Sequence, residues 1–140
     1  MSGGETNLQR LLAGMRPELG NECFVFCTFP DARYGDHADL APVASVQEVE
    51  GLTLVVEQAT ARQAGLAADE AFRRISLGIH SSLDAVGLTA AIAAEFTAAG
   101  ISANVIAGYF HDHVFVQTEV AEKALTVLET LSARARRADR

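Results

Sequence analysis

The chain has 140 residues, of which 49% are hydrophobic, and a formal net charge of -7 with a pI near 5.0. This length fits one compact domain or two very small ones, and the apolar fraction is high enough for a buried core. Nucleic-acid binding needs a basic surface, so we expect no nucleic-acid partner for this acidic chain. The sequence has no recognisable targeting segment and no apolar run of the ~20 residues that span a membrane. We therefore expect a cytoplasmic protein with no membrane partner.

The first half of the sequence predicts a helix, three strands and a second helix. The first helix, over residues 6–15, is expected to begin with a capping box of Thr6 and Gln9. Strands are predicted at 23–29, 43–49 and 52–56, with a polar loop over 30–42, and the second helix at 58–64 ends at Gly65. Cys23 and Cys27 lie in the first strand about 13 Å apart, too far for a disulfide, and are expected to be free thiols.

The second half of the sequence predicts the order strand, helix, strand, strand, helix. Apolar and polar residues alternate over 75–80, and from Ser82 the apolar spacing becomes helical until Gly100. Strands are expected at 101–110 and 113–118 around a tight His111-Asp112 turn, followed by a helix at 119–133. The alternation places Val105, Tyr109 and Phe115 on one face of the sheet and Ile106, Phe110, Val114 and Val116 on the other. Because both faces are apolar, the second should also be covered, by the N-terminal half or by another subunit.

Two motifs in this half carry a family resemblance. Residues 84–89, Asp-Ala-Val-Gly-Leu-Thr, followed by Gly100-Ile101, resemble the turn and the closing pair of the first helix of an ACT domain. Residues 80–83, 86–90 and 108–113 resemble more closely a family of small uncharacterised bacterial proteins with two tandem ACT-like domains. That family is similar to the ACT modules of arginine-sensing proteins.

The resemblance implies an α+β fold of ferredoxin-like ACT units with the βαββα pattern. We expect an N-terminal ACT-like unit in residues 1–68 and a C-terminal ACT domain in residues 69–140. Since the first half begins with a helix where the repeat begins with a strand, the N-terminal copy should be irregular or permuted.

The resemblance also implies a ligand site, because ACT domains bind amino-acid effectors near the turn that opens the helix. A helix N-terminus attracts carboxylates, Asp84 could receive an α-ammonium group, and Asn104 could bond either end of an amino acid. The candidate ligand-binding residues are Ser81, Ser82, Leu83, Asp84, Gly87 and Asn104. The predicted function is non-catalytic, regulatory binding of a small molecule, expected to be an amino acid, by a homodimer without a cofactor.

Two other interpretations of the same residues stay open. Ser and Asp at a helix start are also ordinary caps, so the chain could be a structural or oligomerisation module that binds no ligand. His80, His111 and His113 could instead bind a metal, since imidazole is a common zinc ligand. A polar hairpin turn in which Asp112 bonds its own backbone explains the histidines better, and no Gly-x-Ser-x-Gly elbow accompanies His80 and Ser81. We therefore expect neither catalysis nor a bound metal.

Overall fold

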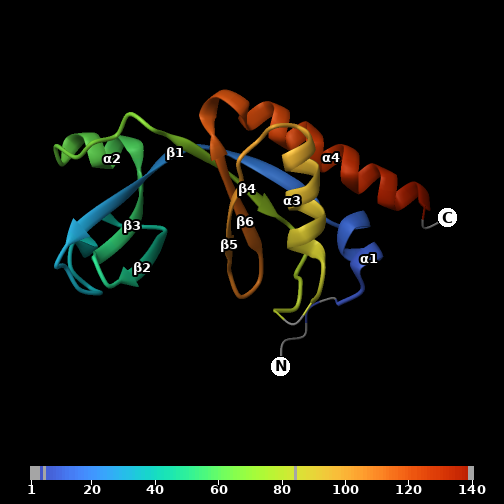
Figure 1. Cartoon of the computed structure of the whole chain (residues 1–140), viewed down its shortest axis with the longest axis horizontal. Helices are drawn as coiled ribbons and strands as arrows, with labels where there is room; N and C mark the ends of the chain where they lie inside the picture. The colour runs from blue at the N-terminus through green and yellow to red at the C-terminus, as the bar shows by residue number, and fades with distance from the viewer. Residues whose placement is uncertain (1–3, 5, 84, 139–140) are drawn as a thin grey trace. The chain divides into compact units, whose positions relative to one another are not determined.

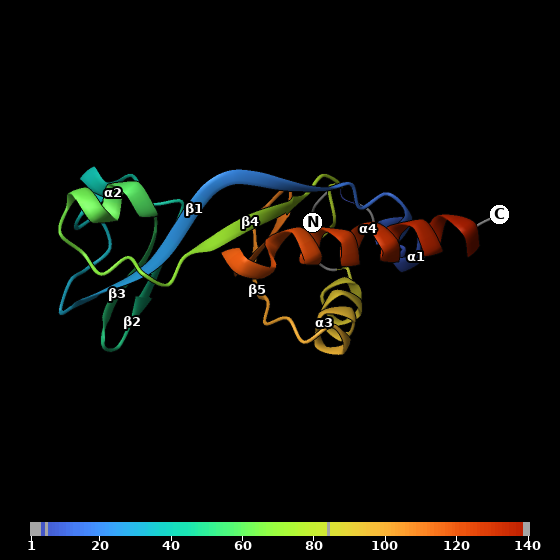
Figure 2. The same ribbon diagram turned by 90° about the horizontal axis from the view of Figure 1, so that it is seen from above.

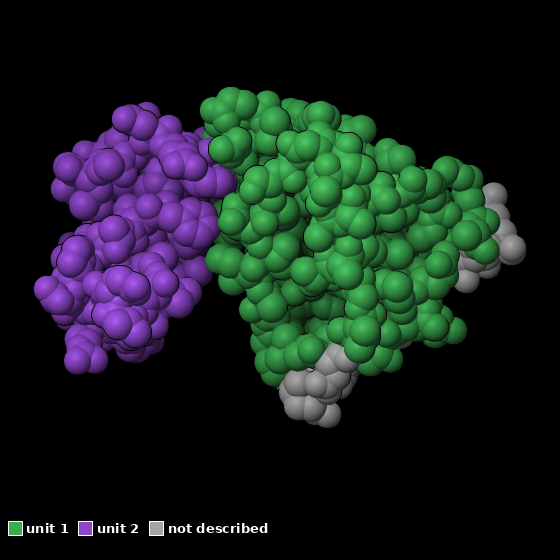
Figure 3. Space-filling view, viewed as in Figure 1, with its two compact units in different colours: residues 1–20, 73–140 green, residues 21–72 purple. Residues whose placement is uncertain are grey.

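The computed structural model describes residues 4, 6–83 and 85–138, and the chain divides into two compact units (Figure 1, Figure 3). Unit 1 consists of residues 1–20 and 73–140, and unit 2 consists of residues 21–72. The strand β1 (Pro17–Pro30) begins in unit 1 and continues into unit 2. The expected boundary between residues 68 and 69 separates repeats along the sequence, and it stays a prediction.

Unit 2 contains an antiparallel sheet in the order β2-β3-β1. The strand β3 (Gly51–Glu57) pairs with β2 (Ala44–Glu48) on one side and with β1 on the other. The short helix η1 (Ala38–Leu40) follows β1, and α2 (Gln58–Gln63) follows β3. The core of this unit is formed by Val25, Cys27, Leu40, Leu52, Leu54, Val56, Ala61 and Ala68. Both cysteines are free, as expected, and burial raises the pKa of the Cys27 thiol.

Unit 1 contains a sheet in the order β1-β4-β6-β5, of which β1 contributes its first residues. The strands are β4 (Phe72–Leu77), β5 (Asn104–Ala107) and β6 (Asp112–Gln117). The helices α1 (Leu8–Ala13), α3 (Leu88–Ala98) and α4 (Ala121–Ala138), the last preceded by η2 (Thr118–Val120), lie together on one face of this sheet (Figure 2). The helices and the sheet enclose a core that includes Leu11, Met15, Ile75, Leu77, Leu88, Ile92, Phe96, Val114, Val116 and Leu128. None of the described helices has the length and apolar character needed to cross a bilayer.

Both halves of the chain repeat one order of elements: strand, helix, strand, strand, helix. The order is β4-α3-β5-β6-α4 in the second half and β1-η1-β2-β3-α2 in the first. In each half the strands lie in the order second, third, first. The three-residue η1 stands where α3 has 11 residues. The prediction of an α+β fold with βαββα units, the N-terminal one irregular, is confirmed.

Several predicted boundaries are wrong. Asn7, rather than the Thr6–Gln9 pair, caps α1: its side chain accepts a hydrogen bond from the Arg10 N–H at 3.1 Å. The strand β1 begins at Pro17 instead of residue 23, and its partly buried Leu19 packs against the core of unit 1. The helix α3 begins at Leu88 instead of Ser82.

The predicted grouping of side chains on the sheet faces is also wrong. The turn between β5 and β6 spans Gly108 to His111, where the Gly108 N–H donates to the His111 carbonyl at 2.9 Å. Val105 lies opposite Val114, so both face the helices, whereas Phe115 faces the other way. Directly opposed residues of an antiparallel pair share a face, and the register, not continuous alternation through the turn, determines which they are.

We predict that Gly51→Ala destabilises unit 2 more than Gly35→Ala does. Both glycines have positive φ, +145° and +99°, but a side-chain carbon at Gly51 would lie 2.3 Å from the Phe29 carbonyl oxygen, while one at Gly35 would contact nothing within 4 Å. The clash should lower the free energy of unfolding by about 1–3 kcal/mol more than the backbone strain that both variants share. Urea unfolding checks this, and equal losses would contradict it.

Candidate functional site

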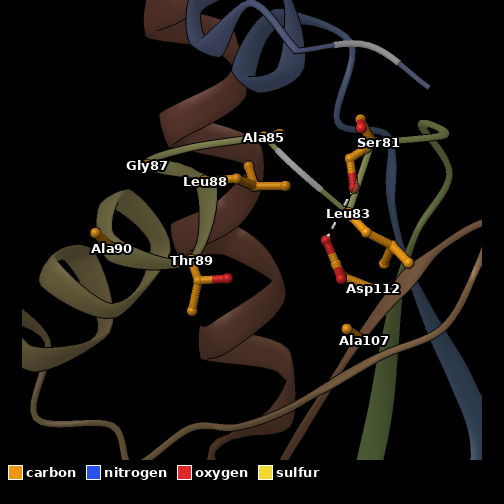
Figure 4. Close-up of a pocket in the computed structure, with 10 residues that line it drawn as sticks. Ser81, Leu83, Ala85, Gly87, Leu88, Thr89, Ala90, Ala107 and Asp112 are labelled. Carbon is orange, nitrogen blue, oxygen red and sulfur yellow. Dashed lines mark hydrogen bonds between the residues drawn. The ribbon is translucent and has the colours of Figure 1, made fainter. Parts of the chain in front are cut away.

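A cavity of about 170 Å³ opens in unit 1 where the loop after β4 leads into α3 (Figure 4). A buried cavity of ~150 Å³ can hold one benzene-sized molecule, so this one is large enough for a small metabolite. Its walls come from the loop, the first turn of α3 and the hairpin of β5 and β6. The lining residues are Ser81, Ser82, Leu83, Ala85, Gly87, Leu88, Thr89, Ala90, Ala107 and Asp112.

The loop exists because α3 begins late. Leu88 is the first helical residue and is buried, and Gly87 before it takes the left-handed conformation, with φ +100°. Ser81 and Ser82 were expected to begin the helix but lie in the loop, where they are 8% and 6% exposed. The Ala85 N–H donates to the Ser82 carbonyl at 3.0 Å, which makes a turn inside the loop. The interpretation of Ser81 as a cap at the helix start is therefore wrong.

A carboxylate lies on one side of the cavity. Asp112 is the first residue of β6, and its Oδ2 accepts a hydrogen bond from the Ser81 hydroxyl at 3.2 Å (Figure 4). The expected bond from Asp112 to its own backbone is thus replaced by a contact with the loop. Among the described residues, no lysine or arginine forms a salt bridge with Asp112.

The opposite side of the cavity carries the N-terminus of α3. The first bond within this helix runs from the Ala91 N–H to the Gly87 carbonyl at 2.9 Å. The N–H groups of Leu88, Thr89 and Ala90 have no hydrogen-bond acceptor among the described residues, and the first turn holds no acidic residue. Such an uncapped N-terminus carries roughly half a positive charge. The cavity therefore has a positive side and a negative side.

The structure brings together only part of the predicted site. Ser81, Ser82, Leu83 and Gly87 line the cavity. Asp84 lies outside the described residues. Asn104 is not among the lining residues, because it sits at the far end of β5, where its amide donates to the Phe115 carbonyl at 3.3 Å.

Sequence reasoning missed the hairpin wall of the cavity. Ala107 and Asp112 are paired across β5 and β6, so they share one face and both border the cavity. A turn placed at residues 108–111 instead of 111–112 would have put Asp112 in a strand. The other residues missed come from the loop and the start of α3: Ala85, Leu88, Thr89 and Ala90.

The three histidines have separate environments. The Nδ1 atom of His113 lies 2.8 Å from the Ser76 hydroxyl, and that of His111 lies 3.5 Å from the Ile79 carbonyl. The His80 ring packs beside Phe110, with ring centroids 5.1 Å apart. In the part of the chain that the structure describes, no three His, Cys, Asp or Glu side chains are grouped as metal ligands. The metal interpretation thus has no geometric support.

Known proteins now identify the family. Models of the ACT domain match residues 3–73 and 68–130. The chain belongs to the ACT domain family. A Vibrio cholerae protein of unknown function, described as a possible transport protein, is 50% identical to it, with a TM-score of 0.80 over 89% of this chain and 95% of that one.

Two more distant solved structures share the fold. The regulatory subunit of aspartate kinase from Thermus thermophilus, in a ligand-free form, is 14% identical, with a TM-score of 0.63 over 84% of this chain and 97% of that one. An Agrobacterium tumefaciens protein is 15% identical, with a TM-score of 0.56 over 83% and 87%. No curated protein sequence matches this ACT protein. The chain is thus a tandem pair of ACT domains, which are regulatory rather than catalytic modules.

We predict that His80→Phe leaves the stability unchanged or raises it. The Nε2 atom of His80 is buried and has no hydrogen-bond partner among the described residues, which costs about 1–3 kcal/mol. Phenylalanine keeps the ring beside Tyr109 and Phe110 without this cost. Thermal melting of the variant and the wild type measures the effect, and a clear loss of stability would show that the imidazole nitrogen has a partner.

We also predict that His113 makes the fold less stable in mild acid. Burial lowers the pKa of His113, and Arg74 and His111 lower it further, against an opposing effect of Asp112. As the pH falls through about 6.5, the unfolded chain therefore binds a proton that the folded ring accepts only at lower pH. The free energy of unfolding should drop between about pH 7.5 and 5.5.

The matched variants for this prediction are His113→Gln and His37→Gln. The pH-dependent loss should be smaller in His113→Gln than in His37→Gln, which removes an imidazole that stacks on Phe29 in unit 2. Urea unfolding at several pH values compares them. The same pH dependence in both variants would contradict the prediction.

Proposed function

We propose that this ACT protein is a regulatory module that binds a free α-amino acid in the cavity of unit 1. The observation that carries the proposal is the pair of opposite charges across the cavity, the uncapped start of α3 on one side and the Asp112 carboxylate on the other (Figure 4). An α-amino acid is a zwitterion, so its carboxylate and its ammonium group match these two sides. A ligand with one charge would leave the other side unpaired.

The proposed orientation follows from the donors and acceptors. The ligand carboxylate accepts hydrogen bonds from the N–H groups of Leu88, Thr89 and Ala90, which have no acceptor among the described residues. The ammonium group donates to Asp112, which the Ser81 hydroxyl holds in place at 3.2 Å. Charge-assisted bonds of this kind are roughly twice as strong as neutral ones.

Of the other predicted site residues, those that line the cavity would also contact the ligand. Ser82, with a small side chain, and Gly87, with none, line the cavity, and Leu83, which is 49% exposed, provides an apolar contact at its rim. Asp84, outside the described residues, stays a proposed contact for the ammonium group. Asn104 has no place in the proposed site.

The competing function is a structural module that binds no ligand. Against it stand two features of the described residues: the first N–H groups of α3 have no acceptor, and the Asp112 carboxylate has no salt bridge to a lysine or arginine. A Ser, Thr, Asp or Asn side chain at the N-cap could accept a hydrogen bond from these N–H groups, whereas Gly87 has no side chain to do so. The proposal retains a homodimer in the cytoplasm, where free amino acids are present.

We predict that at least one standard L-amino acid stabilises the protein against heat. A ligand at 100 times its dissociation constant adds about 2.7 kcal/mol to the free energy of unfolding. The matching 2-oxo acid, which lacks the ammonium group, and the matching amine, which lacks the carboxylate, should give no shift. A melting screen with all three compound classes is the test, and no shift with any amino acid would reject the proposal.

We predict that Asp112→Asn weakens this stabilisation. The substitution keeps the size of the side chain and removes the charge that attracts the ammonium group. Charged hydrogen bonds contribute about 1.5–3 kcal/mol, so the dissociation constant should rise by roughly 10- to 150-fold. Asp39→Asn, an exposed residue of η1 in unit 2, is the matched control and should bind as the wild type does. Calorimetric titration compares them, and equal affinities would show that Asp112 does not contact the ligand.

A further inference from the structure

Gly4, near the N-terminus, packs against the loop that forms the cavity. Gly4 lies so close to this loop that a side-chain carbon added to it would be 2.5 Å from the Ser82 backbone nitrogen and 2.6 Å from the Ser81 carbonyl carbon. Only glycine permits such an approach between two stretches of backbone. Ser81 and Ser82 both line the cavity, so Gly4 packs on its wall.

A second contact holds the other end of the same loop. A side-chain carbon added to Gly87 would lie 3.2 Å from the Leu8 Cδ2 atom, so the Leu8 side chain packs over the glycine that precedes α3. Leu8 is the first residue of α1 and is 37% exposed, so its side chain is far more exposed than those of the core. Its position suits a contact with the loop better than a contribution to the core.

The helix α1 gives these contacts a fixed base. Leu11 and Met15 are fully buried in the core of unit 1. The Gln9 amide donates to the Ala135 carbonyl of α4 at 2.6 Å, and the Ser132 hydroxyl donates to the Ala13 carbonyl at 3.2 Å. Because α1 is held to the core and to α4 in this way, Leu8 stays over Gly87 as long as α1 is in place.

We propose that Gly4 and Leu8 are positioning residues that strap Ser81, Ser82 and Gly87 into the conformation that binds the amino acid. This proposal rests on the proposed function and extends it to the N-terminal segment. The apparent dissociation constant rises in inverse proportion to the fraction of molecules in the binding-competent conformation. Loosening the strap therefore weakens binding without removing any group that touches the ligand.

Hydrogen–deuterium exchange of the ligand-free full chain tests the strap independently of any ligand. Gly4→Ala and Leu8→Ala should each speed amide exchange in residues 81–87 by about tenfold, the effect of a typical single substitution on a local opening. The matched control is Leu12→Ala, which removes an α1 side chain that packs on the core. Unchanged exchange in 81–87 in Gly4→Ala and Leu8→Ala, or an equal rise in Leu12→Ala, would overturn the strap.

Two further outcomes keep the test decisive. If Leu8→Ala speeds exchange in β6 as well, the core has loosened and Gly4→Ala, which removes no packed side chain, decides alone.

The amino acid that gives the largest melting shift in the wild type is then titrated into Gly4→Ala. A dissociation constant about tenfold higher supports the proposal, and an unchanged one overturns it. No shift in the wild type rejects the proposed function, whereas the exchange result still decides whether the strap exists.

Discussion

The burial of one face of α3 determines where this helix begins, and the cavity depends on that position. Leu88, Ile92 and Phe96 are spaced by four residues and are 4%, 2% and 1% exposed in the core of unit 1. With Leu88 in the first turn, residues 78–87 must cross from β4 to α3 as a loop. Among the described residues, no side chain of the loop caps the helix N-terminus, and small polar side chains lie on the other side of the cavity. Packing of apolar residues thus creates the polar site.

The sequence predicted the order of the elements well, because alternation and helical spacing are local patterns. It failed at the start of α3, where Ser81 and Asp84 have the spacing of a capping box. In the structure the Ser81 hydroxyl bonds Asp112, 31 residues further along the chain. Local rules consider only neighbours in sequence. They cannot predict that the Ser81 hydroxyl donates to the distant Asp112 carboxylate instead of capping the helix.

The candidate site was predicted from one side only. Its loop wall, with Ser81, Ser82 and Gly87, follows from a motif that lies in one stretch of sequence. Its hairpin wall depends on the register of β5 and β6, which pairs Ala107 with Asp112. Register follows from turn geometry and from the face that is buried, and a turn misplaced by a few residues moves a carboxylate from a strand into a loop.

The two ACT units share an order of elements but differ in the chemistry that their first connection allows. The three-residue η1 is too short to build a helix dipole, whereas α3 has 11 residues. Two backbone groups of the loop before η1 are also paired with a side chain of β2: the Gln47 amide accepts from the Tyr34 N–H at 2.7 Å and donates to the Ala32 carbonyl at 3.1 Å. Polar groups that are already paired have little to offer a ligand. The irregular copy thus keeps the sheet of the fold, while the proposed amino-acid site lies in unit 1.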